Sequence, residues 1–133
     1  MLGDLIYVGK GRITDTRVLN AEENKIEHTL IEDGKFKDID VIMTITFWTI
    51  TSGNKTIYGE AQGIITTKDL MDTATCKAYG IGRYSESGKT TFRATMFFKT
   101  TPNGKLSFLN NTIGLVESEV DSLQHLAKIW EWK

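Results

Sequence analysis

The sequence predicts an all-β fold, an eight-stranded antiparallel up-and-down barrel formed by a single domain over residues 1–133. Three observations lead to this prediction. Apolar and polar residues alternate with period two along most of the chain, which is typical of strands that turn one face inward. Short polar turns separate the runs, and no stretch has helical periodicity. Eight strands in so short a chain are expected to close, because closure removes exposed sheet edges. A two-sheet sandwich is the alternative, since strand count does not separate the two.

The first four strands are expected in the first half of the chain, separated by polar turns. Gly9 and Gly11 interrupt the first strand, which is expected to bend or break there. Asp33-Gly34 predicts the hairpin turn after the second strand, because both residue types tolerate positive φ. The third strand has the densest run of β-branched and aromatic residues. The predicted ranges are Leu5–Leu19, Lys25–Glu32, Phe36–Thr51 and Thr56–Thr67.

The last four strands follow the same pattern. The only proline, Pro102, lies in the turn after the sixth strand, where it breaks no strand. The loop at residues 121–124, before the last strand, has room for one helical turn. The predicted ranges are Thr73–Tyr84, Lys89–Thr100, Lys105–Val120 and Leu126–Lys133.

Composition is that of an ordinary soluble globular protein, about two-fifths apolar and a quarter charged. The net charge of −1 argues against a nucleic-acid or membrane partner, because both attract a basic surface. The single cysteine, Cys76, cannot form an intramolecular disulfide, which fits a reducing compartment. The N-terminus lacks the pattern of a secretory signal, and no stretch approaches the roughly 20 apolar residues of a membrane-spanning helix. A cytoplasmic location is therefore expected.

Several strands carry apolar residues on both faces, and this predicts a homo-oligomer. A barrel buries only one face of each strand, so a second apolar face needs a partner subunit or a covering segment. In the third strand one face carries Met43, Ile45 and Phe47 and the other carries Ile42, Trp48 and Ile50.

No cofactor or metal is expected. Gly88-Lys89-Thr90 resembles the end of a phosphate-binding loop, but the upstream glycine is misplaced and a strand follows instead of a helix. His28 and His125 are isolated in the sequence, without metal-ligand spacing, and no nucleophile elbow occurs.

The strongest candidate site residues lie in the fourth strand. Tyr58, Glu60 and Gln62 share one face, and Gly59, Ala61 and Gly63 form the other. If the Tyr-Glu-Gln face points inward, Glu60 is a carboxylate inside the barrel that needs a partner. If it points outward, Glu60 is a solvated surface group. The sequence leaves the choice open.

Four further polar residues complete the candidate site. Arg83 and Arg93, on the next two strands, are natural partners for an inward Glu60. In the predicted seventh strand, one of Asn110 and Asn111 must face inward, where an amide orients a ligand or satisfies backbone groups.

Several motifs resemble those of a group of small uncharacterised archaeal and bacterial proteins. The motifs are YGEAQGIITT, AYGIGR, TFRATMFFKT, FLNN and a terminal KIWEWK. The chain departs from the group at Ala61 and Ala94, where glycine is expected. At fold level the meander is similar to the barrels of allene oxide cyclase and dirigent proteins. That resemblance implies a lumen for hydrophobic small molecules and a trimeric assembly. Lipocalin-like calycin barrels are a second comparison, but the GxW motif of many lipocalins is missing here.

Three functions follow from these observations. The leading hypothesis is a barrel that binds a hydrophobic or amphipathic small molecule in its lumen, with polar contacts from the candidate residues. The second is a cofactor-free isomerase or cyclase in which Glu60 is the general base and Arg93 stabilises negative charge. The third is an interaction protein whose narrow lumen is filled by side chains.

Overall fold

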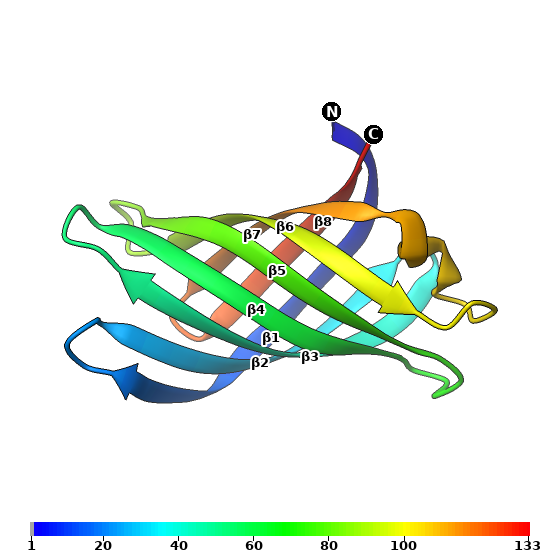
Figure 1. The fold of residues 1–133 in the computed structure, drawn as a ribbon, viewed down its shortest axis with the longest axis horizontal. Helices are drawn as coiled ribbons and strands as arrows, with labels where there is room; N and C mark the ends of the chain where they lie inside the picture. Colours follow the sequence, from blue (N-terminus) through cyan, green and yellow to red (C-terminus); the bar gives the residue numbers. More distant parts are fainter. Residues whose placement is uncertain (1) are drawn as a thin grey trace.

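The computed structural model describes residues 2–133 and is a closed barrel of eight antiparallel strands (Figure 1). The strands are β1 (Leu2–Asn20), β2 (Lys25–Phe36), β3 (Ile39–Thr51), β4 (Thr56–Thr67), β5 (Thr73–Tyr84), β6 (Thr90–Thr100), β7 (Ile113–Asp121) and β8 (Gln124–Trp132). Each strand pairs with the next, and β8 pairs with β1. The predicted up-and-down barrel is therefore confirmed over the sandwich. No helix in the described part of the chain is long and apolar enough to cross a membrane.

The bounds predicted for β4 and β5 are those observed, but the turn predicted at Asp33-Gly34 is wrong. These two residues lie inside β2, and the chain turns at residues 37–38, where Lys37 has a φ of 54°. Gly34 lies opposite Gly9 of β1. A Cβ atom on either glycine would lie 2.0–2.3 Å from the hydroxyl of Tyr7. The glycines thus make room for the Tyr7 ring and do not form a turn.

The break predicted near Gly9 and Gly11 is also absent, because β1 continues through both residues. Its register shifts instead between Ile13 and Asp15 and between Val18 and Asn20. The loop before β8 is a two-residue turn at 122–123, in which Ser122 has a φ of 58°, and not a helical turn.

The predicted seventh strand is wrong in its first half. Residues 107–111 form a short 3₁₀ helix, η1 (Ser107–Asn111), and β7 begins only at Ile113. Leu106 and Leu109 are fully buried in the core, so this segment covers one end of the barrel. Packing of two leucines into the barrel end is favoured here over continuation of the strand, because it removes their side chains from water.

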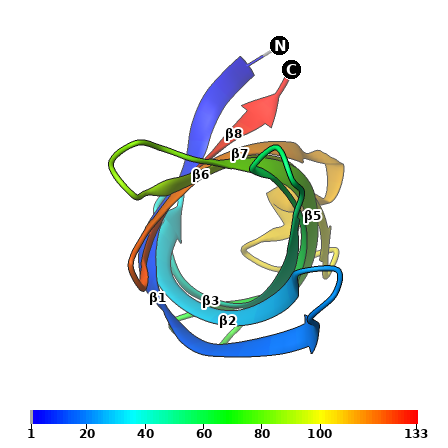
Figure 2. The ribbon, with the colours of Figure 1, turned by 90° about the vertical axis from the view of Figure 1, so that its left-hand side faces the viewer.

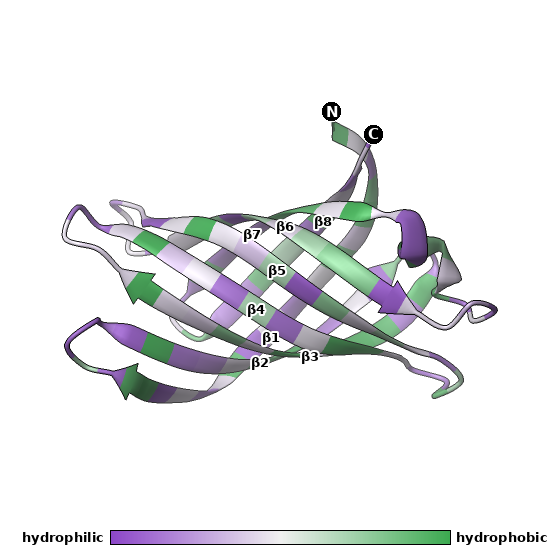
Figure 3. Cartoon of the chain, viewed as in Figure 1, coloured by the Kyte–Doolittle hydropathy of each residue, from purple (hydrophilic) through white to green (hydrophobic). Residues whose placement is uncertain are grey.

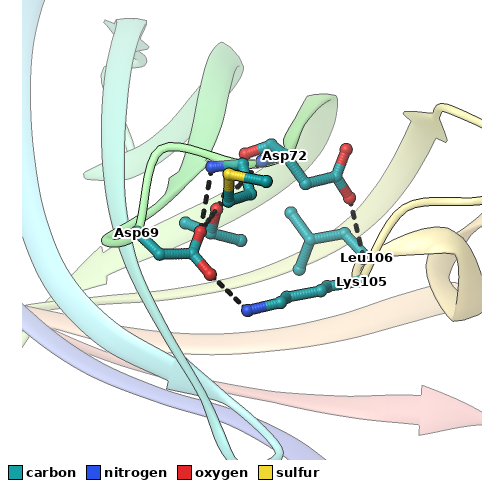
Figure 4. Close-up of polar contacts among 6 residues, drawn as sticks. Asp69, Asp72, Lys105 and Leu106 are labelled. Atoms are coloured by element: carbon teal, nitrogen blue, oxygen red, sulfur yellow. Dashed lines mark hydrogen bonds and ion pairs between the residues drawn. The ribbon is translucent and has the colours of Figure 1, made fainter.

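Hydrogen bonds to Asp72 hold this cover in place (Figure 4). The Asp72 carboxylate accepts the backbone N–H of Leu106 at 2.9 Å and the Thr101 hydroxyl at 2.9 Å. These bonds, the one from the Leu106 N–H above all, lower the pKa of Asp72. Asp69 forms an ion pair with Lys105 between the same two loops. The connection after β4 and the one after β6 are thereby tied together.

The barrel interior contains one apolar cluster, and the strands alternate between buried and exposed residues. Figure 3 shows this alternation as hydrophobic and hydrophilic bands along the strands. The largest fully buried side chains include Tyr7, Phe36, Leu30, Met43 and Ile129. At the end opposite η1, turns at residues 21–24, 52–55, 85–89 and 122–123 surround the barrel opening (Figure 2). The molecule therefore has one covered and one uncovered end.

Candidate functional site

A cavity of about 90 Å³ lies in the barrel lumen. Its wall is mostly apolar and includes Leu30, Met43, Ile45, Met96, Val116 and Ile129. The inward polar side chains on the wall come from Glu32, Thr49, Ser118 and His125. An apolar cavity with a few polar groups is the usual composition of a small-molecule site.

The aromatic residues on the cavity wall lie toward the uncovered end of the barrel. Phe47 and Phe92 contact each other edge to face, with ring centroids 6.4 Å apart. His28 stacks on Phe47 at 4.8 Å, and burial lowers the pKa of this histidine. Phe47 and Phe92 thus form the aromatic part of the cavity wall.

Three polar side chains from β1, β2 and β8 form a buried cluster beside this cavity. The Tyr7 hydroxyl donates to Oε1 of Glu32 at 2.7 Å, and Nδ1 of His125 lies 2.5 Å from Oε2 of the same carboxylate. Tyr7 and Glu32 are each 1% exposed, and His125 is 9% exposed. A carboxylate this deeply buried needs such partners, because its transfer from water is otherwise very unfavourable. We call these residues the lumen triad.

Glycine in β1 allows the triad to form. Gly11 lies opposite Glu32 on one side and opposite His125 on the other, so the three residues form one row across the sheet. A Cβ atom on Gly11 would lie 2.1 Å from the Ile31 carbonyl oxygen and 2.6 Å from the Glu32 Cα. With no side chain between them, Glu32 and His125 reach each other across β1. Tyr7 reaches the same carboxylate by lying over the glycine pair described above.

Nε2 of His125 is the ring nitrogen of the triad that Glu32 does not hold. The Glu32 carboxylate accepts from the Tyr7 hydroxyl and lies against Nδ1 of His125, so in the neutral imidazole with its proton on Nδ1 the lone pair is on Nε2. The described residues give Nε2 no hydrogen-bond partner, and none of their fully buried side-chain nitrogen or oxygen atoms lacks one. Nε2 is therefore accessible, and His125 lines the cavity. Burial and the neighbouring carboxylate raise the pKa of Tyr7 far above its usual value, so its hydroxyl stays a donor.

The structure answers the question that the sequence left open for β4. Gly59, Ala61 and Gly63 face the interior, and Tyr58, Glu60 and Gln62 face outward. Glu60 contributes to the cavity wall, but its cross-strand neighbours are Trp48 and Tyr79 and its side chain borders an outer groove. The expectation that this face supplies polar contacts inside the lumen is therefore corrected.

The other predicted site residues also lie away from the lumen. Arg83 and Arg93 are exposed on the outer face, and neither forms an ion pair with Glu60 among the described residues. Asn110 and Asn111 are exposed in η1 and not in a strand. The Asn110 side chain accepts the backbone N–H of Thr100 at 3.1 Å, which is a structural role.

The lumen triad was not predicted as a site, although the sequence carries one signal for it. Glu32 is in phase with Leu30 and Phe36 on the inward face of β2, and His125 is in phase with Ala127 and Ile129 of β8. A charged residue on an otherwise apolar strand face marks a buried group that must be paired. The pairing itself depends on the register of β1, β2 and β8.

Comparisons with known proteins show the fold and no more. The chain is similar to a β-barrel-like protein from Acinetobacter baumannii, with 13% identity, a TM-score of 0.83 and coverage of 100% of this chain and 96% of that one. A protein of unknown function from Clostridium acetobutylicum has 10% identity, a TM-score of 0.80 and 98% coverage of both chains. A conserved protein of unknown function from Rhodopseudomonas palustris has 14% identity, a TM-score of 0.74 and coverage of 96% and 94%.

No family model and no curated protein sequence matches the chain. Likeness at this level of identity carries the architecture but not an activity. The chain therefore shares its fold with a β-barrel-like protein and with two proteins of unknown function from three bacteria.

Proposed function

We propose that the barrel binds a compact, mostly apolar molecule in its lumen and that Nε2 of His125 accepts a hydrogen bond from it. The observation behind this proposal is the accessible Nε2 on the wall of an apolar cavity, held in place by Glu32. A hydroxyl or N–H on the ligand would pair with this nitrogen, because the lone pair has no partner in the described part of the chain. The preferred ligand is thus a hydrogen-bond donor with an apolar body.

The size of the cavity limits the ligand. At about 90 Å³ it is smaller than the roughly 300–1,000 Å³ typical of drug-sized ligands. An apolar cavity of roughly 150 Å³ is known to accept benzene. Met43 and Met96 line the wall, and methionine adapts its shape readily. A single-ring molecule therefore fits after small side-chain movements, whereas a long amphipathic ligand would have to displace Phe47 or Phe92.

The resemblances seen in the sequence are in keeping with a binding lumen. Barrels of the allene oxide cyclase and dirigent type enclose a lumen for hydrophobic small molecules, and this chain is expected to share that use of the fold. The likeness is one of architecture, so it supports the kind of ligand and not its identity.

Phenol and benzene are suitable probes, because they differ by one hydroxyl. In a methyl NMR titration we expect both to shift Met43 and Met96, with phenol binding about tenfold tighter through one hydrogen bond. Ala78→Leu places three extra carbons in the cavity wall and should abolish binding. Lys77→Leu changes the exposed neighbour on the same strand and should leave binding unchanged. Absence of methyl shifts in the wild-type protein, or equal binding to the Ala78→Leu variant, would contradict the proposal.

Proton transfer is a second candidate function. The side chain of Glu60 points outward, whereas His125 has the arrangement of a general base, with its Nδ1 held by a carboxylate and its Nε2 accessible. In this reaction a C–H bond next to a ketone carbonyl breaks, the electron pair enters an enolate and the proton moves to Nε2. A deuteron from solvent then returns to carbon.

Acetone is small enough to serve as the probe for this reaction. We expect the wild-type protein to accelerate exchange of its methyl protons in D₂O, followed by NMR, and the His125→Gln variant to lose the acceleration. Equal exchange with and without the wild-type protein would eliminate this candidate and leave the binding proposal standing.

A further inference from the structure

The last part of β1 has no neighbouring strand on one of its two sides. On the side of β8, β1 is paired only from Leu2 to Arg12, and the last main-chain bond on that side runs from the Ile13 N–H to the Leu123 carbonyl at 2.8 Å. From there to Asn20, β1 pairs with β2 alone. Figures 1 and 2 show this part of the β1–β2 hairpin extending past the β7–β8 turn with its outer side free. We call residues 14–20 the free edge.

A free edge of this kind pairs readily with another strand. Its unpaired N–H and C=O groups form a template for a ladder, and natural proteins usually protect such edges with proline, lysine or a covering segment. The free edge holds neither proline nor lysine, and no described segment covers it. Val18, within it, is 63% exposed.

We propose that two copies of this chain pair antiparallel along the free edge, about a two-fold axis at Thr16. In this register Asp15 lies opposite Arg17 of the partner subunit, and the symmetry creates the same pair twice. Registers centred on Asp15 or on Arg17 would instead place like charges opposite each other, which is unfavourable in a sheet. The edge is therefore complementary to itself in one register, as a two-fold interface requires.

The charges around Arg17 support this pairing. Within the chain Arg17 lies opposite Glu27, and its guanidinium contacts that carboxylate at 3.0 Å. Since Arg17 and Asp15 are two residues apart, their side chains leave β1 on the same face. In the dimer each Arg17 would lie between Glu27 of its own chain and the aspartate across the axis. This interface differs from the apolar outer faces on which the sequence-based expectation of an oligomer rests.

Sedimentation velocity over a range of micromolar concentrations tests the proposal. The wild-type chain is expected to form a concentration-dependent dimer. D15R and R17D each place like charges at both pairs, and each should weaken the dimer by about tenfold or more. An equimolar mixture of the two variants restores opposite charges at both positions and should form a heterodimer. D38R makes the same charge change in the β2–β3 turn at the covered end and should dimerise like the wild type.

Circular dichroism of each variant separates loss of pairing from loss of folding. A wild-type chain that stays monomeric at every concentration would overturn the proposal and leave the edge to a strand of another protein. Dimers that persist in both D15R and R17D would overturn it by placing the interface elsewhere. A mixture of folded variants that forms no heterodimer would overturn the proposed register.

Discussion

The Tyr7→Phe substitution tests whether the lumen triad stabilises the barrel. It removes one hydroxyl and leaves Oε1 of a fully buried carboxylate without its donor at 2.7 Å. Hydrogen bonds to charged groups contribute about 1.5–3 kcal/mol to the free energy of unfolding. Removal of one partner in the interior is expected to lose most of this contribution. For 133 residues, an unfolding entropy of about 2.1 cal/mol/K per residue converts this loss into a decrease in Tm of about 5–11 °C.

Thermal and urea denaturation followed by circular dichroism measure this loss. Tyr58→Phe makes the same chemical change at an outward position that is 46% exposed. Its free energy of unfolding should stay within about 0.5 kcal/mol of the wild-type value. The double variant Tyr7→Phe, Glu32→Gln should lose less stability than the sum of the two single variants, because the two side chains form the same hydrogen bond. If Tyr7→Phe unfolds at the wild-type midpoint, the reasoning that this bond satisfies the buried carboxylate is refuted.

Three further predictions concern the covered end, the glycine row and the thiol. Asp72→Asn should lower the urea midpoint at pH 7. Because the pKa of Asp72 is lowered in the folded protein, its contribution is present above the unfolded-state pKa of about 4 and is lost as the pH falls through the lower folded-state pKa, so the difference between the two midpoints should shrink as the pH is lowered below 4. A difference between the midpoints that does not shrink as the pH is lowered below 4 would contradict this. Gly11→Ala should lower the free energy of unfolding by more than about 3 kcal/mol or prevent folding, because its Cβ would meet backbone atoms that cannot move aside. A near-wild-type urea midpoint would show that β1 shifts to accommodate the methyl group. Burial raises the pKa of Cys76 to about 12, so a disulfide reagent at pH 8 should label this thiol only after unfolding. Rapid labelling of the native protein would contradict this and show that β5 opens locally.

The architecture of this protein could be predicted from its sequence. Period-two alternation, polar turns and the absence of helical periodicity are local properties, and together they place most strands. Closure was favoured because it removes open sheet edges, although strand count alone did not separate a barrel from a sandwich. The prediction was wrong where a residue type serves two purposes. Asp33-Gly34 and Gly9 are typical of turns and bends, but here the glycines give space to the Tyr7 ring.

Which face of β4 points into the barrel was decided only by the tertiary structure. Alternation defines two faces without saying which one is inside. Gly63 faces inward because the Ile45 side chain from the neighbouring strand occupies the space beside it, and a Cβ atom there would lie 2.8 Å from that side chain. The volume of neighbouring side chains thus places the small residues inside and directs Glu60 outward.

The lumen triad likewise depends on the fold. Glu32 lies 25 residues from Tyr7 and 93 residues from His125 in the chain. Their contact requires β8 and β2 to pair with opposite sides of β1 at the same glycine, and that register is set by barrel closure. The sequence alone determined most of the strands and the two faces of each. The tertiary structure decided which polar groups meet inside, because that depends on which residues of distant strands share a row.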